Sequence, residues 1–259
     1  MIFDTHAHYD DKAFDEDREV LLKSLPEKGV VGIVNAAADL SSSQLSVKLA
    51  EKYPYIYAAV GIHPENLENL GDDYISELEK MVTENKKVVA VGEIGLDYHF
   101  RKDNKARQTE VFEAQVQLAK KLDLPVIVHD RDAHGDCLKV LENLRPKGIV
   151  HCFSGSLEMA KQVVDLGMYI GVGGVLTFKN AKTLLEVVSQ IPLEKMVLET
   201  DAPYLAPVPM RGKRCDSSMI KYAAQKIAQL KGLSARRVYE VTLQNALKIF
   251  KIKTIGENS

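Results

Sequence analysis

The 259-residue sequence has little cysteine, almost no net charge and no long hydrophobic run. The three cysteines, Cys137, Cys152 and Cys215, have no short metal-ligand spacing and leave one thiol over, so a disulfide framework is not expected. No apolar stretch reaches about 18 residues. Met1 is followed at once by a strand-like segment, without the basic and apolar regions of a signal peptide. We therefore expect a cytoplasmic protein that does not contact a membrane.

The charge balance also restricts the possible partners. Lysine and arginine number 34 and aspartate and glutamate 36, which gives a formal net charge of −2. No global field draws such a protein to nucleic acid, so binding of a polyanion requires a local patch. The hydrophobic fraction of 46% is ordinary for a globular protein with a sizeable core. The length fits one large domain over residues 1–259.

Short apolar or β-branched runs alternate with longer amphipathic segments along the whole chain. This alternation is typical of repeated βα units on a parallel sheet. Eight strands are predicted, over residues 2–8, 31–37, 55–62, 87–94, 125–130, 148–153, 168–174 and 196–201.

Helical apolar spacing occupies the segments between these strands, at residues 16–25, 41–52, 73–84, 109–122, 136–144, 157–166 and 181–190, and again near 217–231 and 234–250. Eight βα units predict an α/β fold of the (β/α)₈ TIM barrel type. A doubly wound open sheet is the less favoured alternative, because it usually stops near five or six strands.

Histidines gather at the ends of the predicted strands. His6 and His8 stand two residues apart, a spacing that aims both rings at one face of a strand. His63, His129 and His151 end three further strands. Catalytic groups of such barrels lie where strands end, so these positions predict a metal site.

Two carboxylates at strand ends complete this candidate site. Four histidines with Glu93 and Asp201 exceed what one tetrahedral ion can use, whereas two divalent ions bridged by one carboxylate would use them all. The predicted metal ligands are His6, His8, Glu93, His129, His151 and Asp201. We assign the bridge to Glu93 and the handling of the attacking water to Asp201, and we predict two divalent cations, Mg, Mn or Zn.

Other polar residues at strand ends are open to more than one interpretation. His63 could contact a substrate phosphate or brace the loop before Pro64. Glu199 should point inward with Asp201 and is more simply explained as orienting a ligand than as binding metal. His99 and His134 are interpreted as ordinary hydrogen-bonded histidines.

The motifs that carry these residues resemble the TatD family of metal-dependent deoxyribonucleases, in the amidohydrolase superfamily. The similarity covers nearly the whole chain and rests on Phe3-Asp4-Thr5-His6-Ala7-His8, Gly61-Ile62-His63-Pro64, Val91-Gly92-Glu93-Ile94-Gly95-Leu96-Asp97-Tyr98, Val128-His129 before Arg131-Asp132-Ala133, His151-Cys152-Phe153-Ser154-Gly155 and Glu199-Thr200-Asp201-Ala202-Pro203-Tyr204-Leu205. Each motif alone is weak. Together they are highly specific.

The resemblance implies a (β/α)₈ barrel, a divalent metal pair and hydrolysis of phosphodiester bonds. It further implies a nuclease that acts on DNA from an end, for which we expect a 3′-5′ exonuclease acting on single-stranded ends. The family's ligands fall on the six residues already assembled from spacing, with Glu93 at the bridging position. We expect a monomer with DNA as its substrate.

One segment departs from the family pattern. The family commonly continues from Arg-Gly-Lys into Asn-Glu-Pro, whereas this chain reads Arg211-Gly212-Lys213-Arg214-Cys215-Asp216-Ser217. Arg211, Lys213 and Arg214 still suit phosphate, although a basic loop is often only solvated surface. Phe178, after the seventh predicted strand, could stack on a base of single-stranded substrate or pack against the barrel.

Two other functions remain open on the sequence alone. The same site could hydrolyse another ester or an amide, such as an aminoacyl-nucleotide, because fold and metal do not decide the substrate. A non-catalytic nucleic-acid binder is the more distant alternative, since a pure binder has no need of an open, carboxylate-bridged pair.

Overall fold

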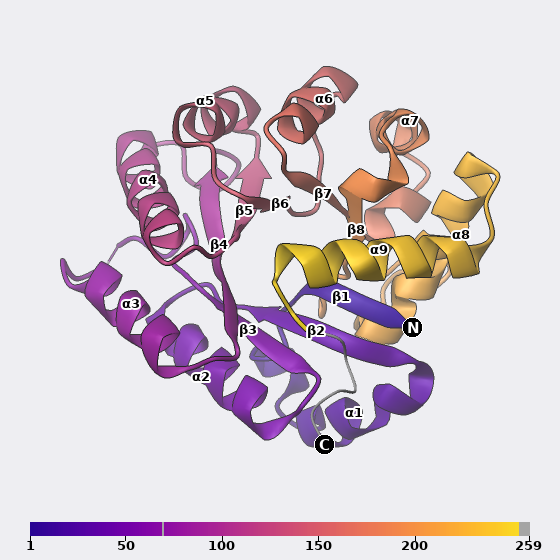
Figure 1. The fold of residues 1–259 in the computed structure, drawn as a ribbon, viewed down its shortest axis with the longest axis horizontal. Helices are drawn as coiled ribbons and strands as arrows, with labels where there is room; N and C mark the ends of the chain where they lie inside the picture. The colour runs from indigo at the N-terminus through magenta and orange to yellow at the C-terminus, as the bar shows by residue number, and fades with distance from the viewer. Residues whose placement is uncertain (69, 254–259) are drawn as a thin grey trace.

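In a computed structural model, eight parallel strands and their helices form a barrel (Figure 1). The structure describes residues 1–68 and 70–253, so residue 69 and residues 254–259 of the expected domain lie outside the described residues. The strands follow the order of the chain from β1 to β8, and each neighbouring pair is parallel. The predicted (β/α)₈ fold is confirmed.

The strands are β1 Ile2–Ala7, β2 Val30–Ala36, β3 Ile56–Val60, β4 Val88–Asp97, β5 Val126–Arg131, β6 Gly148–Val150, β7 Tyr169–Val172 and β8 Met196–Leu198. The helices are α1 Arg18–Ser24, α2 Leu40–Lys52, α3 Tyr74–Glu84, α4 Lys105–Lys121, α5 His134–Leu144, α6 Leu157–Asp165, α7 Lys182–Gln190, α8 Ile220–Lys231 and α9 Ala235–Ile249. No helix of the described residues is both long and apolar enough to cross a bilayer.

The predicted bounds of strands six and eight were too long at their carboxyl ends. Strand β6 ends at Val150 and β8 at Leu198, because the chain turns sharply at Cys152 (φ 41°) and Asp201 (φ 63°). A positive φ is incompatible with an extended strand. Strand β4, in contrast, runs three residues past its predicted end, to Asp97. Helix α8 starts later than predicted, after the short 3-10 turn Ser217–Met219.

The barrel closes through residues that follow β8. Ala7 forms an isolated parallel bridge with Ala202, and the backbone N–H of Asp201 donates to the carbonyl of His6 at 3.0 Å. Earlier on β1, the buried carboxylate of Asp4 accepts hydrogen bonds from the Thr200 hydroxyl and the Ser217 hydroxyl, each at 2.6 Å. These contacts fix the end of β1 against the loop that carries Asp201.

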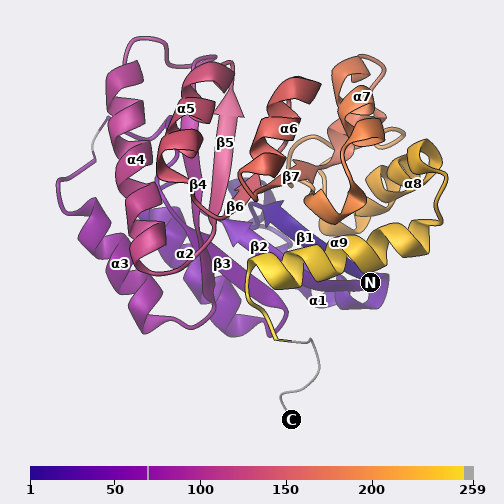
Figure 2. The same ribbon diagram turned by 45° about the horizontal axis from the view of Figure 1, so that its top comes forward.

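Helix α9 covers the end of the barrel that the amino ends of the strands form, beside the start of β1 (Figures 1 and 2). Its apolar side chains join a cluster that takes at least one buried residue from every strand, including Phe3 of β1, Ile127 of β5 and Tyr169 of β7. Leu243 and Phe250 complete this cluster from the helix side. The amino ends of the strands are therefore packed shut, which leaves the carboxyl ends as the open face.

Gly95 is required where β4 approaches β5. Its φ is +149°, and a Cβ at this position would overlap the carbonyl oxygen of His129. Gly95→Ala is therefore expected to lower the free energy of unfolding by about 3 kcal/mol, measured by urea denaturation. The control is Gly135→Ala, in the exposed first turn of α5 with open space around it, which should stabilise by about 0.5 kcal/mol. Equal effects of the two substitutions would contradict this explanation.

Asp4 should make stability depend on pH. Burial outweighs its hydrogen bonds and raises the pKa of its carboxyl from 3.8 to about 6. A raised folded-state pKa stabilises the protein below about pH 4, and this contribution is lost as pH rises through about 6. The rise of the pKa from 3.8 to about 6 corresponds to about 3 kcal/mol in the free energy of unfolding. In urea titrations of metal-free protein from pH 4 to 7, wild type should lose about that much more stability than Asp4→Asn. If the stability of wild type and of Asp4→Asn changes equally between pH 4 and 7, Asp4 is not the source of the pH dependence.

Candidate metal centre

His6 and His8 meet at the end of β1, as their spacing predicts. Their Nε2 atoms lie 3.0 Å apart. The Nδ1 atom of His8 is 2.8 Å from the carbonyl oxygen of Ala36, and a carbonyl can only accept, so Nδ1 of His8 carries the proton. This hydrogen bond leaves the Nε2 lone pair of His8 directed at the site, the form in which a histidine binds metal.

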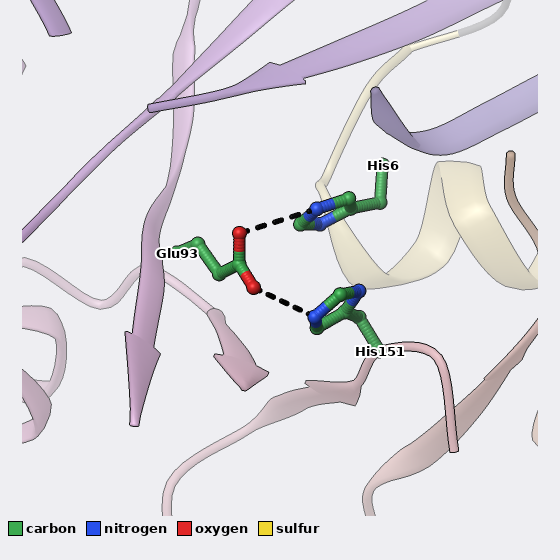
Figure 3. Close-up of side chains that lie close together, drawn as sticks. All are labelled: His6, Glu93 and His151. Carbon is green, nitrogen blue, oxygen red and sulfur yellow. Dashed lines mark ion pairs between the residues drawn. The ribbon is translucent and has the colours of Figure 1, made fainter. Parts of the chain in front are cut away.

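The carboxylate of Glu93 lies between two groups of histidines. Its Oε2 atom is 3.4 Å from Nε2 of His6 and 3.5 Å from Nε2 of His8. Its Oε1 atom is 2.7 Å from both Nδ1 of His129 and Nε2 of His151. Figure 3 shows the two oxygens turned toward His6 and His151 respectively. One carboxylate oxygen therefore faces each group, as a bridging ligand would.

Asp201 completes the first group from the loop after β8. Its Oδ1 atom is 3.5 Å from Nε2 of His6 and 3.3 Å from Nε2 of His8. Its side chain is 18% exposed, against 5% for Glu93, so Asp201 is the carboxylate that faces the open cleft. Burial opposes ionisation of Asp201, but the adjacent histidines outweigh it and hold its pKa below the usual range.

The residues fit a metal ion by their donor chemistry. Three sets of ligand atoms have members that all lie within 4.8 Å of one another: His6, Glu93 and His151; His6, His8 and Asp201; and His63, Glu93 and His129. Glu93 belongs to two of the sets and His6 to two. Imidazole and carboxylate ligands in this mixture suit divalent first-row metals.

The protonation of the histidines differs across the cluster. Burial and the neighbouring His6 lower the pKa of His151 to about 4, so its imidazole is neutral and able to bind metal at pH 7. Burial opposes protonation of His129 as well, but Asp97 and Glu93 outweigh it and raise its pKa to about 9. A cation bound between Glu93 and His129 would take the place of that proton.

His63 lies at the edge of the cluster. Its Nδ1 atom accepts from the backbone N–H of Glu65 at 3.2 Å, and its Nε2 atom is 3.7 Å from Oε1 of Glu93. Burial lowers the pKa of His63 to about 3. The ring thus braces its own loop with one nitrogen while the other faces the site, and its contact with a substrate phosphate stays a prediction.

Asp97 was not assigned a role from the sequence. Its Oδ2 atom is 3.0 Å from Nε2 of His129, and its Oδ1 atom accepts from the backbone N–H groups of His99 and Phe100. It is fully buried at the end of β4, and these bonds hold it in place. The sequence could have indicated that Asp97 faces the site, because Glu93 and Asp97 stand four residues apart on one strand and so share a face.

Glu199, His99 and His134 lie beside the cluster rather than in it. Glu199 is buried, accepts from the backbone N–H of Cys152, and its Oε1 is 3.8 Å from Nδ1 of His151; burial raises its pKa to about 8. His99 and His134 form hydrogen bonds with Asp132 and Asp130, at 3.1 and 2.9 Å.

The predicted substrate residues after β7 and β8 have other partners. The guanidinium of Arg214 forms an ion pair with the carboxylate of Asp17, with contacts of 2.8 and 2.6 Å. Arg211 lies over the ring of Phe178, 4.0 Å from its centroid, and Phe178 packs against the barrel core. Lys213 is exposed. Substrate binding by these four residues stays a prediction, and the ion pair makes Arg214 the weakest of them.

A cleft of about 890 Å³ opens beside the cluster. Its lining includes His129, His151 and Asp201 from the cluster, and Phe100, Arg131 and Tyr204 from the surrounding loops. The cleft thus gives a substrate access, from the carboxyl face of the barrel, to the side of the cluster formed by His129, His151 and Asp201.

An eight-stranded barrel with histidines and carboxylates converging at its open end defines a metal-dependent hydrolase. A family model described as TatD related DNase matches residues 3–251. A relative named as an uncharacterized metal-dependent hydrolase, YabD of Bacillus subtilis, is 39% identical over 255 residues, covering 97% of this chain and all of its own. The chain belongs to the TatD family of metal-dependent hydrolases.

Solved structures agree with this assignment. The crystal structure of YjjV, a TatD homologue from Escherichia coli K12, superimposes with a TM-score of 0.92 at 34% identity, covering 97% of this chain and 98% of that one. An uncharacterized amidohydrolase from Saccharomyces cerevisiae has a TM-score of 0.82 at 19% identity, covering 96% and 100%, and shows the shared fold alone.

Asp97 should act on metal binding through His129. Asp97→Asn keeps the size of the side chain but removes the negative charge that orients the ring. We expect metal affinity to fall about 10-fold to 100-fold, measured by calorimetric titration of the metal-free protein. Asp132→Asn, which alters the exposed partner of His99, is the matched control and should bind metal like wild type. Unchanged affinity in Asp97→Asn would show that His129 is positioned without it.

Proposed function

We propose that the chain is a deoxyribonuclease that uses two divalent cations to hydrolyse phosphodiester bonds at single-stranded DNA ends, in the 3′-5′ direction. The observation that carries this proposal is the Glu93 carboxylate, which offers one oxygen to each of two ligand groups. The description of the matching family model as a DNase supports the substrate. We also propose that the protein acts as a cytoplasmic monomer.

The ligands divide into two groups in this proposal. His6, His8 and Asp201 would hold one cation, His129 and His151 the other, and Glu93 would join them. Bound cations of this kind polarise a phosphoryl oxygen and raise the acidity of water.

The chain's own residues would then direct the water. Asp201 faces the cleft and so orients the attacking water and takes up its proton. The hydrogen bond from His8 to the carbonyl of Ala36 keeps that ring in its ligand form. Burial of Glu93 excludes water from its carboxylate and strengthens its attraction for cations.

Metal removal and substitution of the bridge test the proposal together. Chelator-treated protein, with metal loss confirmed by elemental analysis, should not cleave oligonucleotides, and a divalent metal should restore cleavage. Glu93→Gln should lower kcat/KM by at least about 100-fold, because the bridging charge is lost. Glu186→Gln on the outer face of α7 is the control and should behave as wild type. Cleavage that persists after confirmed metal removal would refute the scheme.

The proposed strand type and direction of cleavage are tested with oligonucleotides labelled at the 3′ or the 5′ end, both single-stranded and duplex. Faster shortening of single strands from the 3′ end is the expected result. If metal-supported turnover is found with small esters or amides but not with DNA, the protein is instead a hydrolase of that class. Tight oligonucleotide binding without turnover under any metal would mark it as a binding protein.

A further inference from the structure

One wall of the cleft pairs an exposed aromatic ring with an arginine. Phe100, in the loop after β4, is 57% exposed, although most large apolar side chains of the described residues are buried. Arg131 is the last residue of β5, and its Cζ lies 4.6 Å from the centroid of the Phe100 ring. Both line the cleft that also contains His129 and Asp201.

The acidic neighbours of Arg131 have other partners. Asp130 is 2.9 Å from Nδ1 of His134, and Asp132 is 3.1 Å from Nδ1 of His99. Among the described residues, no carboxylate forms an ion pair with Arg131. Its guanidinium is therefore placed by the Phe100 ring and keeps its N–H donors for a ligand.

This arrangement suits a nucleotide. A guanidinium stacked on a ring presents donors in its own plane that match two oxygens of a phosphate. An exposed ring gives a stacking surface to any base, which is how single strands are bound without sequence preference. Phe100 and Arg131 offer both functions side by side, next to the metal ligands.

The other aromatic groups near the open face lack this combination. Tyr204, on the wall formed after β8, donates its hydroxyl to Asp11 at 2.6 Å, and no arginine or lysine of the described residues lies over its ring. Phe178 and Arg211 also stack, but neither belongs to the cleft lining. Arg131 is the one lysine or arginine among the described lining residues.

We infer that Phe100 and Arg131 form a nucleotide subsite, in which Arg131 binds a phosphate next to the scissile one and Phe100 stacks on the base of that nucleotide. The inference rests on the proposed nuclease function and gives it a structural basis for selecting strand type. Inside a duplex both faces of a base are covered by its neighbours, so the subsite favours unpaired ends, where a base can turn onto Phe100. With one cation in the lining, binding extends over few nucleotides and depends weakly on salt.

The test compares Phe100→Leu and Arg131→Gln with wild type. On a single-stranded oligonucleotide, each variant should raise KM about tenfold with little change in kcat. Phe100→Tyr, which keeps the ring, should restore the wild-type KM. Arg236→Gln, which removes an exposed arginine on α9, is the charge control and should leave KM unchanged. All variants should hydrolyse methyl 4-nitrophenyl phosphate, a diester without a base, at wild-type rates.

An oligonucleotide whose terminal nucleotides are abasic separates stacking from a general effect of the substitution. Wild type should bind the abasic strand about tenfold more weakly than the intact strand. The Phe100→Leu variant should bind the abasic strand as well as wild type does. If Phe100→Leu raises KM equally for intact and abasic ends, or for neither, the subsite is refuted.

Competition assays keep this inference distinct from the nuclease proposal. With methyl 4-nitrophenyl phosphate as substrate, thymidine 5′-monophosphate should inhibit wild type about tenfold more tightly than deoxyribose 5-phosphate. Phe100→Leu should abolish this difference. If no DNA is cleaved but the difference holds, the nuclease proposal fails and the nucleotide subsite stands. If DNA is cleaved but the difference is absent, the subsite alone fails.

Discussion

The buried carboxylate of Glu93 is the interaction on which the functional end of the barrel depends. A carboxylate so deeply buried is stable only when cations or strong donors surround it. Here four histidines lie within 3.5 Å of its two oxygens. They come from β1 and the residue after it, from β5 and from the turn after β6, so the barrel must close before the carboxylate is satisfied. Fold and site are thus parts of one arrangement.

The turns after β6 and β8 explain how the short strands deliver their ligands. Strand β6 ends one residue before His151, and β8 ends three residues before Asp201. Left-handed backbone at Cys152 and at Asp201 turns each segment at the mouth of the barrel instead of letting it continue as a strand. Glu199 supports one of these turns by accepting from the backbone N–H of Cys152. The positions of His151 and Asp201 therefore depend on loop conformation as much as on the sheet.

Much of this arrangement could be predicted from residue types and spacing. The eight strands have apolar runs, and the six clustered residues lie in the carboxyl-terminal halves of the strands or just after their ends, where a parallel barrel brings chemistry together. The contacts that depend on distant partners could not be predicted. Arg214 looked free for phosphate, yet Asp17, 197 residues earlier, pairs with it. The availability of Arg131 depends on His99 and His134 engaging its acidic neighbours, which spacing alone does not reveal.

The covered amino end of the barrel has a consequence for synthesis of the protein. Phe3 is made among the first residues, but its cluster is completed by Leu243 and Phe250 of α9 and the segment after it. The hydrogen bond between Asp4 and Ser217 likewise spans 213 residues. Contacts this distant in sequence form slowly. A nascent chain on the ribosome therefore cannot complete the cluster around its first strand until translation is almost finished.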